Sequence, residues 1–446
     1  MLYLQIYEIN SAVTDFPVLI IMTNNNAMNL SVINYILQII NKNQMADYPI
    51  IAFAALLFFA YGLFSKAAEK SVVTPPMIFV TIGIFASFFS VDFLNGGVKA
   101  PFVKIIAELA LILVLFVDAS TINLKALIKE RRLPMRLLLI GLPVTMVLGT
   151  LIAIPLFPGV NIWLILLMAL ILSPTDAALG QAVVTSELVP EKIRRTINVE
   201  SGLNDGLALP PILVCLAVLA GGESHGAGFS YWGLFTLKQF IYGPVIGGLV
   251  GWFGGMLVDK ASTREWMNHT FQSLAALAIA ILAFALAEMV HGNGFIAAFF
   301  AGLMLGTKTE NVRERLKEFG EAESQAFVLI IFLLFGMIVV PMVWQYWDFS
   351  AWLYAVLSLT IIRMLPVAVS LIGAKLPRFD VLFIGWFGPR GIASVLYLLL
   401  MVIKIGSEGF EPVISVIVLT VLLSILLHGL TAVPLSGMYG RKKESV

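Results

Sequence analysis

Nine ionisable side chains stand inside long apolar segments of this sequence, where a charge is costly, and four of them are the candidates for a functional site. These four are Asp176, Glu200, Asp205 and Arg390. A charged group at the centre of a membrane-spanning helix costs about 2.5–3.5 kcal/mol on insertion scales, so each requires a partner, a cavity or a proton. Two carboxylates in a poorly solvated site raise each other's proton affinity, and a bound cation relieves the same repulsion. These residue types therefore predict a site for a small cation and for protons.

Asp176 follows a proline in an otherwise apolar helical segment, expected at 161–182. Pro174 removes one backbone hydrogen bond and clashes with the preceding turn, so we expect the helix to kink or unwind there. Carbonyl groups freed beside a carboxylate suit a small dehydrated cation. Irregular backbone is tolerated at membrane depth only where it is buried or lines a watery cavity. The alternative is an ordinary proline kink in which Asp176 caps the free amides.

The second acidic segment lies on the next apolar helix, expected at 193–219. Ser201 and Asp205 are four residues apart and share one face, while Glu200 and Asn204 share the neighbouring face. Asp205 lies about 12 residues from the inner end, which is about 18 Å at a rise of 1.5 Å per residue. This places Asp205 near the middle of the membrane.

A fixed positive charge occurs in a Gly-Pro-Arg-Gly break of the segment expected at 381–403. Arg390 keeps its proton under all ordinary conditions, so a carboxylate must compensate it. We predict that Glu200 is this partner, which leaves Asp176 and Asp205 free for the cation or proton. In the alternative, Arg390 pairs with Asp205 and no ion site exists. Arg363 is expected to pair with a helix carbonyl or a carboxylate and not to bind a ligand.

Composition explains why these groups must lie in a membrane. Of the 446 residues, 59% are hydrophobic and 12% charged, against roughly 25% charged in a soluble domain. The net charge of +1 gives no reason to expect a nucleic-acid partner, and the single Cys215 excludes an intrachain disulfide. Runs near the length needed to cross the bilayer predict an all-α polytopic protein of about 13 spans. Their expected limits are 48–65, 73–93, 102–120, 134–156, 161–182, 193–219, 231–257, 270–290, 292–306, 326–344, 351–372, 381–403 and 411–436.

The distribution of basic residues predicts the orientation. Most of the 28 Lys and Arg residues follow odd-numbered spans, while the other side has only Lys99, Lys104 and Lys404. Basic loops face the cytoplasm, so the N-terminus is expected outside and the C-terminus inside. Spans one to six and eight to thirteen then form two sets of opposite topology with broken fifth helices. Such an inverted repeat places a transport site at the midplane.

Several segments together resemble the NhaP-like, electroneutral branch of the monovalent cation–proton antiporters, which is related to the animal Na⁺/H⁺ exchangers. The most specific segment is Glu-Ser-Gly-Leu-Asn-Asp-Gly at 200–206, and the matching segments occur in the family's order over roughly 48–436. The others are Phe-Val-Asp-Ala-Ser at 116–120, Ser-Pro-Thr-Asp at 173–176, Gly-Phe-Ile-Ala-Ala-Phe-Phe-Ala-Gly at 294–302 and Gly-Pro-Arg-Gly at 388–391.

The resemblance implies roles for individual residues. Asp205 would be the main carrier of cation and proton, with Asp176, Ser201 and the Thr175 backbone as co-ligands. Asn204, in place of a second acid, implies 1:1 electroneutral exchange. Glu200 and Arg390 would form a stabilising pair. The role of Asp118, which stands where the family often has Glu, would be at the mouth of the cavity.

It also implies an organisation. An NhaA-like fold would have a six-helix core at 134–219 and 351–436, moving against a dimerisation part at 48–120 and 231–344. Residues 1–47 are an N-terminal extension of unknown role, and 437–446 a short basic cytoplasmic tail. The resemblance further implies a homodimer in the cytoplasmic (inner) membrane, with monovalent cations and protons as partners, no cofactor and a role in pH homeostasis.

The expected activity is therefore secondary transport and not catalysis. Na⁺, or Li⁺, would exchange for H⁺ because both compete for the Asp176 and Asp205 site, which crosses the membrane when loaded and not when bare. K⁺/H⁺ exchange is the alternative within this class. Rivals from other classes are a passive channel or ion sensor, and an intramembrane aspartyl protease with the two aspartates as its dyad. Neither aspartate has a Gly-x-Gly-Asp setting, and a protease gives Arg390 no role.

Overall fold

The computed structural model describes residues 5–9, 18–22, 52–66, 71–88, 101–122, 132–176, 179–221, 229–308 and 324–444. The chain divides into two compact units, Met1–Leu63 and Phe64–Val446. The remainder of the predicted N-terminal extension, the basic loops at 123–131 and 309–323, and the last two residues lie outside the described residues.

Among the described residues, the first unit departs from the predicted all-α chain. Strand β1 (Gln5–Ile9) pairs antiparallel with β2 (Val18–Met22), with Gln5 opposite Met22 and Ile9 opposite Val18. The second strand is Val-Leu-Ile-Ile-Met, a β-branched composition that favours a strand. The extension therefore has a hairpin where no element was predicted, although the rest of the described chain is helical.

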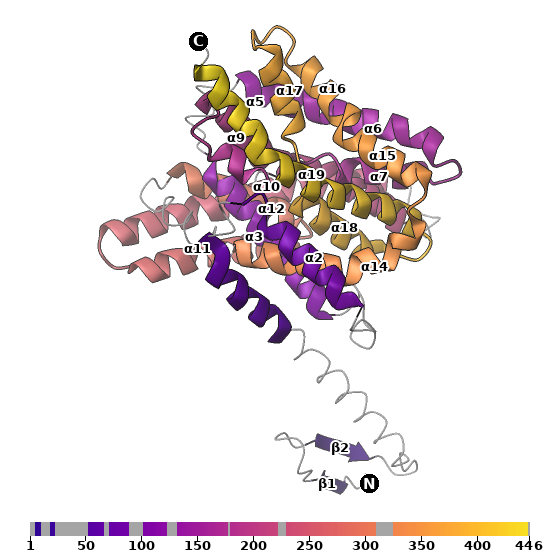
Figure 1. Cartoon of the computed structure of the whole chain (residues 1–446). Coiled ribbons are helices and arrows are strands. Elements are labelled where there is room, and N and C mark those ends of the chain that lie inside the picture. Colours follow the sequence, from indigo (N-terminus) through magenta and orange to yellow (C-terminus); the bar gives the residue numbers. More distant parts are fainter. Residues whose placement is uncertain are drawn as a thin grey trace. The chain divides into compact units, whose positions relative to one another are not determined.

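The second unit is built of helices that pack side by side (Figure 1). Within the described residues, seven helices are long and apolar enough to cross a membrane. They are Arg132–Leu156, Glu191–Ala220, Ile241–Thr263, Thr270–Met289, Ser324–Tyr346, Phe349–Ser370 and Glu411–Tyr439.

The described residues also contain shorter apolar helices. They are Ala52–Lys66, which runs across the boundary of the two units, α2 (Pro75–Ser87), α7 (Ile162–Ile171), α12 (Gly294–Lys308) and α18 (Ile392–Ile405).

The first discontinuous helix unwinds at the predicted proline. Helix α7 ends at Ile171, residues 172–176 are not helical, and a short α8 (Gln181–Val184) follows. Pro174 cannot donate a backbone hydrogen bond, so the helix does not continue past it. The next helix, α9 (Glu191–Ala220), runs without interruption through both acidic positions.

The second discontinuous helix unwinds at the predicted Gly-Pro-Arg-Gly segment. Helix α17 (Arg378–Trp386) is followed by non-helical residues 387–391 and then by α18. Helix α19 (Glu411–Glu444) comes next and extends beyond residue 436, where its span was predicted to end.

A further group of helices packs together. Helix α10 (Phe229–Thr263) and α11 (His269–Met289) lead to α12, and α12 packs against α10 and α3 (Pro101–Thr121). The predicted boundary at 291–294 is present, because His291 has a φ of 60° and α12 begins at Gly294.

Two of the long helices contain a π-helical turn. In the first, α5 (Arg132–Arg136), π-helix η3 (Leu137–Gly141) and α6 (Leu142–Leu156) follow one another. In the second, π-helix η4 (Phe335–Val339), α14 (Val340–Val343) and the 3-10 turn η5 (Trp344–Tyr346) end the Ser324–Tyr346 span.

The span Phe349–Ser370 is made of two helices, α15 (Phe349–Leu359) and α16 (Ile361–Ser370).

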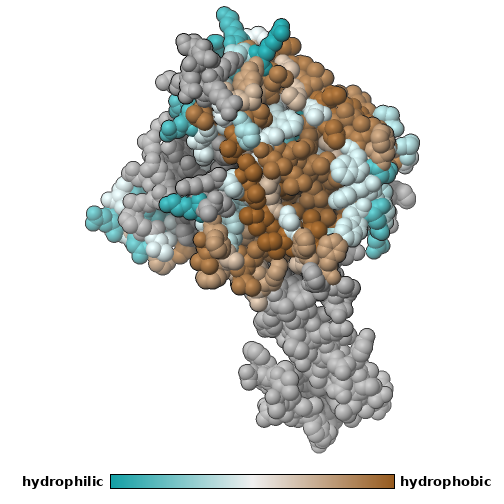
Figure 2. Space-filling view, in the orientation of Figure 1, coloured by the Kyte–Doolittle hydropathy of each residue, from teal (hydrophilic) through white to brown (hydrophobic). Residues whose placement is uncertain are grey.

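Apolar side chains cover much of the surface, as expected of a protein that faces lipid. Figure 2 shows a broad hydrophobic area on one face, with hydrophilic residues gathered at its margins. The most exposed large apolar side chains include Phe59, Phe64, Met289, Phe349 and Ile372. A water-soluble protein rarely exposes so large an apolar patch. Together with the seven long apolar helices, this surface identifies a multi-pass membrane protein.

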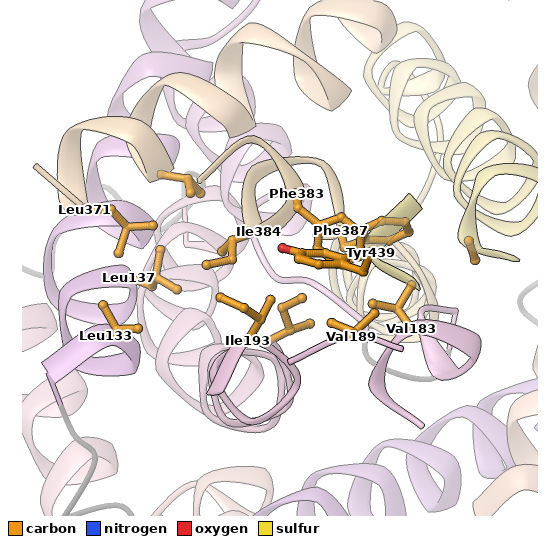
Figure 3. Packing of buried hydrophobic residues seen from close by; sticks show 13 residues of the cluster. Leu133, Leu137, Val183, Val189, Ile193, Leu371, Phe383, Ile384, Phe387 and Tyr439 are labelled. Carbon is orange, nitrogen blue, oxygen red and sulfur yellow. The ribbon is translucent and has the colours of Figure 1, made fainter. Parts of the chain in front are cut away.

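An apolar cluster ties the two discontinuous helices together (Figure 3). Val183 of α8, after the first break, and Phe387, at the start of the second break, both belong to it. The Phe383 ring lies 4.5 Å from the Phe387 ring and 4.8 Å from that of Tyr439 in α19 (centroid distances). Both unwound segments are therefore held by one packed core. Its other buried members are Leu133, Leu137, Val189, Ile193, Ile197, Val367, Leu371, Ile384 and Ala432.

Phe383→Ala should lower the stability of the fold by about 3–5 kcal/mol, because it leaves a cavity in this cluster. Phe383 is 4% exposed, whereas Phe349 is 79% exposed, so Phe349→Ala is the matched control. The measurement is the thermal unfolding midpoint of the purified protein in detergent. Equal midpoints for the two variants would show that the cluster does not stabilise the fold.

Candidate cation and proton site

The two unwound segments bind directly to each other. The Asp176 N–H donates to the Pro389 carbonyl (2.8 Å), and the Ile392 N–H donates to the Asp176 carboxylate at Oδ2 (2.8 Å). Gly391 permits this approach, because a Cβ atom there would collide with the Asp176 carboxylate. The Asp176 carboxylate thus lies at the N-terminus of α18, where the helix dipole favours a negative charge.

Arg390 holds the first unwound segment by its carbonyl groups. Its fully buried guanidinium donates from Nη1 to the carbonyls of Ser173 (2.6 Å) and Pro174 (3.2 Å). These carbonyls lie just beyond the C-terminus of α7, where the helix dipole favours a positive charge. Ser394 of α18 adds a third contact, because its hydroxyl donates to the Ile171 carbonyl (2.8 Å). Each broken helix therefore supplies partners for the backbone of the other.

The polar face of α9 meets the same segment. The Ser201 hydroxyl donates to the Thr175 carbonyl, and the Asn204 amide Nδ2 donates to Thr175 Oγ1 (2.6 Å). Asp205, one residue further along α9, is 3% exposed. Within the described part of the chain, no hydrogen-bond partner reaches its Oδ1 atom. The predicted residues Asp176, Thr175, Ser201, Asn204 and Asp205 thus lie on segments that contact one another.

The surroundings of Asp205 are rich in negative charge. Asp118 of α3 and Asp176 both lie close enough to interact with it electrostatically. Asp118 is partly buried, and Ile122, the residue that follows the end of α3, lies close to Gly202 of α9. Since like charges in a poorly solvated place repel, a cation or a proton at Asp205 lowers the energy of the group. The arrangement suits reversible binding of a small cation.

The predicted pair between Glu200 and Arg390 is wrong. Glu200 of α9 instead accepts two hydrogen bonds from Arg363 of α16, at 2.6 Å from Nη1 and 2.9 Å from Nη2. Gly388 makes room for this guanidinium, since a Cβ atom there would collide with it. The bidentate geometry satisfies both carboxylate oxygens. Arg363 therefore pairs with a carboxylate, as predicted, but with the one assigned to Arg390.

Several polar residues of the site were not predicted. The buried Tyr397 of α18 donates to the Asp205 carbonyl (2.8 Å), and Ser424 of α19 accepts from the Arg390 N–H (2.6 Å). His428 lies one turn further along α19 and is also buried. Their signal in the sequence is the spacing of polar groups within apolar helices, with Ser394 and Tyr397 three apart and Ser424 and His428 four apart. Prediction of the site rested on charged side chains and on polar residues next to the two aspartates in the sequence, and these residues are neither.

A resident metal centre has a different chemistry from this site. Among the described residues, no group of three or more His, Cys, Asp and Glu side chains gathers to hold a metal ion. The donors around Asp205 are carboxylate, hydroxyl and carbonyl oxygens, which hard monovalent cations favour.

A family model matches most of the chain, and curated relatives match about half to two thirds of it. The family model for the sodium/hydrogen exchanger, transmembrane, matches residues 32–436. A K⁺/H⁺ antiporter NhaP of Alkalimonas amylolytica is 29% identical over 233 residues, 52% of this chain and 39% of the relative. An Na⁺/H⁺ antiporter of Schizosaccharomyces pombe is 26% identical over 314 residues, 62% and 65% of the two chains. The chain thus spans less than two thirds of the length of these relatives.

A solved structure shares the fold. The sodium proton antiporter MjNhaP1 from Methanocaldococcus jannaschii at pH 8 superimposes with a TM-score of 0.68 at 20% identity. The match covers 89% of this chain and 98% of that one. A likeness at this identity establishes the membrane antiporter fold and leaves the choice of ion open.

The corrected ion pair leads to a test by a double-mutant cycle. Arg363→Met alone leaves Glu200 buried without its counter-charge and should cost about 3–5 kcal/mol, while the double variant with Glu200→Gln should cost less than the sum of the two. The measurement is the unfolding stability of the purified variants. The parallel cycle of Glu200→Gln with Arg390→Met is the control. A larger coupling energy in that control would reinstate the predicted pair.

Proposed function

We propose that this chain, which belongs to the sodium/hydrogen exchanger family of transmembrane proteins, exchanges Na⁺ for H⁺ across the cytoplasmic membrane. The substrate site comprises Asp205 and Asp176, with Ser201 and Thr175 as further oxygen donors. One observation carries the proposal: the Asp205 carboxylate is buried beside two unwound helices, and its Oδ1 atom lacks a hydrogen-bond partner within the described residues. A buried carboxylate in this state requires a cation or a proton.

Competition for this carboxylate couples the two fluxes. When Asp205 holds a proton, it no longer attracts a cation, and when it holds a cation, the proton is displaced. The loaded site carries less net charge than the bare one, so it crosses the membrane at a lower electrostatic cost. Alternating access of this kind requires only one site and yields exchange.

The neighbouring side chains have distinct duties in this cycle. Asp176 is partly committed, since its Oδ2 atom accepts from Ile392 N–H (2.8 Å). Asp176 therefore contributes a fixed negative charge, and its other carboxylate oxygen is a proposed ligand of the cation. The Asn204 amide donates to Thr175 Oγ1 (2.6 Å), which orients that hydroxyl. Asn204 itself adds no titrating group. Only the Asp205 carboxylate then changes its load, with one proton or one monovalent cation at a time, and this favours 1:1 electroneutral exchange. The partly buried Asp118 would lie at the mouth of the cavity.

The proposal extends to the organisation of the molecule. The core is 134–219 with 351–436, since these segments contain both breaks and both buried arginines. The part at 48–120 and 231–344 is proposed to mediate a homodimer, on the family likeness and the exposed apolar side chains of α10. The N-terminus outside and the C-terminus inside follow from the basic loops, and the cytoplasmic (inner) membrane is the proposed location.

K⁺/H⁺ exchange is the second candidate, because specific relatives support it. The NhaP of Alkalimonas amylolytica and the NhaP2 of Shewanella baltica are both named K⁺/H⁺ antiporters. The same oxygen donors serve either ion, and the size of the loaded site decides between them. Exchange in proteoliposomes with Na⁺, Li⁺ and K⁺ in turn separates the candidates. A passive channel would instead dissipate a pH gradient without any added cation being required.

Asp205→Asn should reduce exchange to below about one hundredth of the wild-type rate, because the neutral amide carries neither the cation nor the proton. The measurement is the dissipation of a preset pH gradient in proteoliposomes on addition of Na⁺. Asp259→Asn, the same substitution at the distant end of α10, should retain the wild-type rate. Wild-type exchange by the Asp205→Asn protein would overturn the proposed site.

Electroneutrality has its own test. Moving one net charge per cycle against 100 mV costs about 2.3 kcal/mol, which would change the rate many-fold. In a 1:1 cycle of two monovalent ions no net charge crosses, so the exchange rate should remain the same when an inside-negative or inside-positive potential is imposed. A rate that rises steeply with one sign of the potential would contradict the 1:1 stoichiometry.

A further inference from the structure

Ser424 and His428, one turn apart on α19, contact both ends of the second unwound segment. At its beginning, His428 Nε2 lies 2.9 Å from the carbonyl of Trp386, the last residue of α17. Towards its end, the Arg390 N–H donates to Ser424 Oγ (2.6 Å). The two side chains also meet, with 3.2 Å between Ser424 Oγ and His428 Nδ1. Ser424 and His428 thus bond to the Arg390 N–H and the Trp386 carbonyl, two backbone groups that the break in the helix leaves without helical partners.

The direction of each hydrogen bond follows from its partners. The Trp386 carbonyl can only accept, so His428 Nε2 carries the hydrogen. The Arg390 N–H can only donate, so Ser424 Oγ accepts it and its own hydrogen is free to point to His428 Nδ1. A neutral ring with hydrogen on Nε2 thus links Arg390 through Ser424 and His428 to Trp386. His428 Nδ1 also lies 3.0 Å from the Ser424 carbonyl, to which it would donate only in a ring with hydrogen on Nδ1. A second contact supports this arrangement, since the Trp386 and His428 rings lie 5.0 Å apart.

These hydrogen bonds connect His428 to the proposed cation site through Arg390. The backbone of Arg390 is held by Ser424, while its side chain holds the Ser173 and Pro174 carbonyls. Those carbonyls immediately precede Thr175 and Asp176 in the first unwound segment. A shift of Arg390 is therefore transmitted to two of the proposed oxygen donors.

We propose that His428 is a positioning residue for cation binding, acting through Ser424 and Arg390. It keeps the 387–391 segment attached to α19, so that Arg390 presents its guanidinium to the first break at a fixed place. His428 itself touches neither the cation nor the carrier carboxylate. The transport part of this inference rests on the proposed exchange activity, whereas its structural part does not.

The chemistry of His428 suggests the variants to compare. Gln carries an N–H donor and an acceptor oxygen in one planar group, so His428→Gln can serve both Trp386 and Ser424. His428→Leu fills a similar volume and serves neither. Ser424→Ala removes the link from the Arg390 side. Thr420→Val is the matched control on α19. Thr420 is also fully buried, and among the described residues its hydroxyl bonds to the Val416 carbonyl of its own helix (2.7 Å).

The first measurement is the apparent KM for Na⁺ and the maximal rate of exchange in proteoliposomes. His428→Leu and Ser424→Ala should raise the apparent KM about tenfold, which corresponds to one lost hydrogen bond. His428→Gln should remain within about threefold of the wild type, and Thr420→Val should match it. An unchanged KM in His428→Leu, or equal impairment of the Gln and Leu variants, would overturn the positioning role.

The second measurement is hydrogen–deuterium exchange of the amides at 387–392 in detergent, which requires no transport. Ser424→Ala and His428→Leu should accelerate exchange there, while His428→Gln and Thr420→Val should retain the wild-type pattern. If wild-type vesicles exchange none of Na⁺, Li⁺ and K⁺ but this pattern appears, the proposed function fails and the anchoring by His428 stands. If transport is normal in the wild type and the amides of all variants exchange alike, the anchoring fails.

Discussion

The molecule depends on one constraint, which is that backbone groups inside a bilayer must find partners within the protein. Two helices are unwound where they are buried, so their N–H and carbonyl groups need partners within the protein. They bond to each other, through Asp176 and Pro389 and through Ile392 and the Asp176 carboxylate. Three features stabilise this contact between the two unwound segments, which we call the crossing. They are Gly391, the apolar cluster around Phe383 and the Arg390 guanidinium. The proposed substrate site is a consequence of the crossing, because the crossing is what leaves oxygen donors beside a buried carboxylate.

Charge is divided between two arginines with different tasks. Arg363 neutralises Glu200 in a bidentate pair that leaves no carboxylate oxygen of Glu200 free of contact. Arg390 bonds to carbonyl groups and so stabilises the end of α7 without taking a carboxylate. This division leaves Asp205 without a permanent positive partner among the described residues. In the proposed cycle a mobile cation replaces a proton there, which a fixed guanidinium would prevent.

Local features of the sequence predicted the breaks, while contacts between distant segments required the structure. Pro174 and the Gly-Pro-Arg-Gly segment disrupt a helix by their own geometry, and both unwound where predicted. The partner of Glu200 was mistaken because two buried arginines satisfy the same charge argument. Only the packing of α16 against Gly388 selects Arg363. His428 and Ser424 escaped notice since neutral polar residues carry no insertion penalty large enough to demand a partner. The β1–β2 hairpin lay in a segment without a helical or membrane pattern.

The central claim is that cation and proton compete for one carboxylate site, and calorimetry of Na⁺ binding to the purified protein tests it directly. Titrations in buffers of different ionisation enthalpy report the protons released per cation bound. Competition predicts release of about one proton per cation at a pH where the site is protonated, and an apparent affinity that falls as the pH is lowered. The same measurement with Li⁺ and K⁺ ranks the candidate substrates. Tight Na⁺ binding without proton release, at an affinity independent of pH, would contradict the shared site.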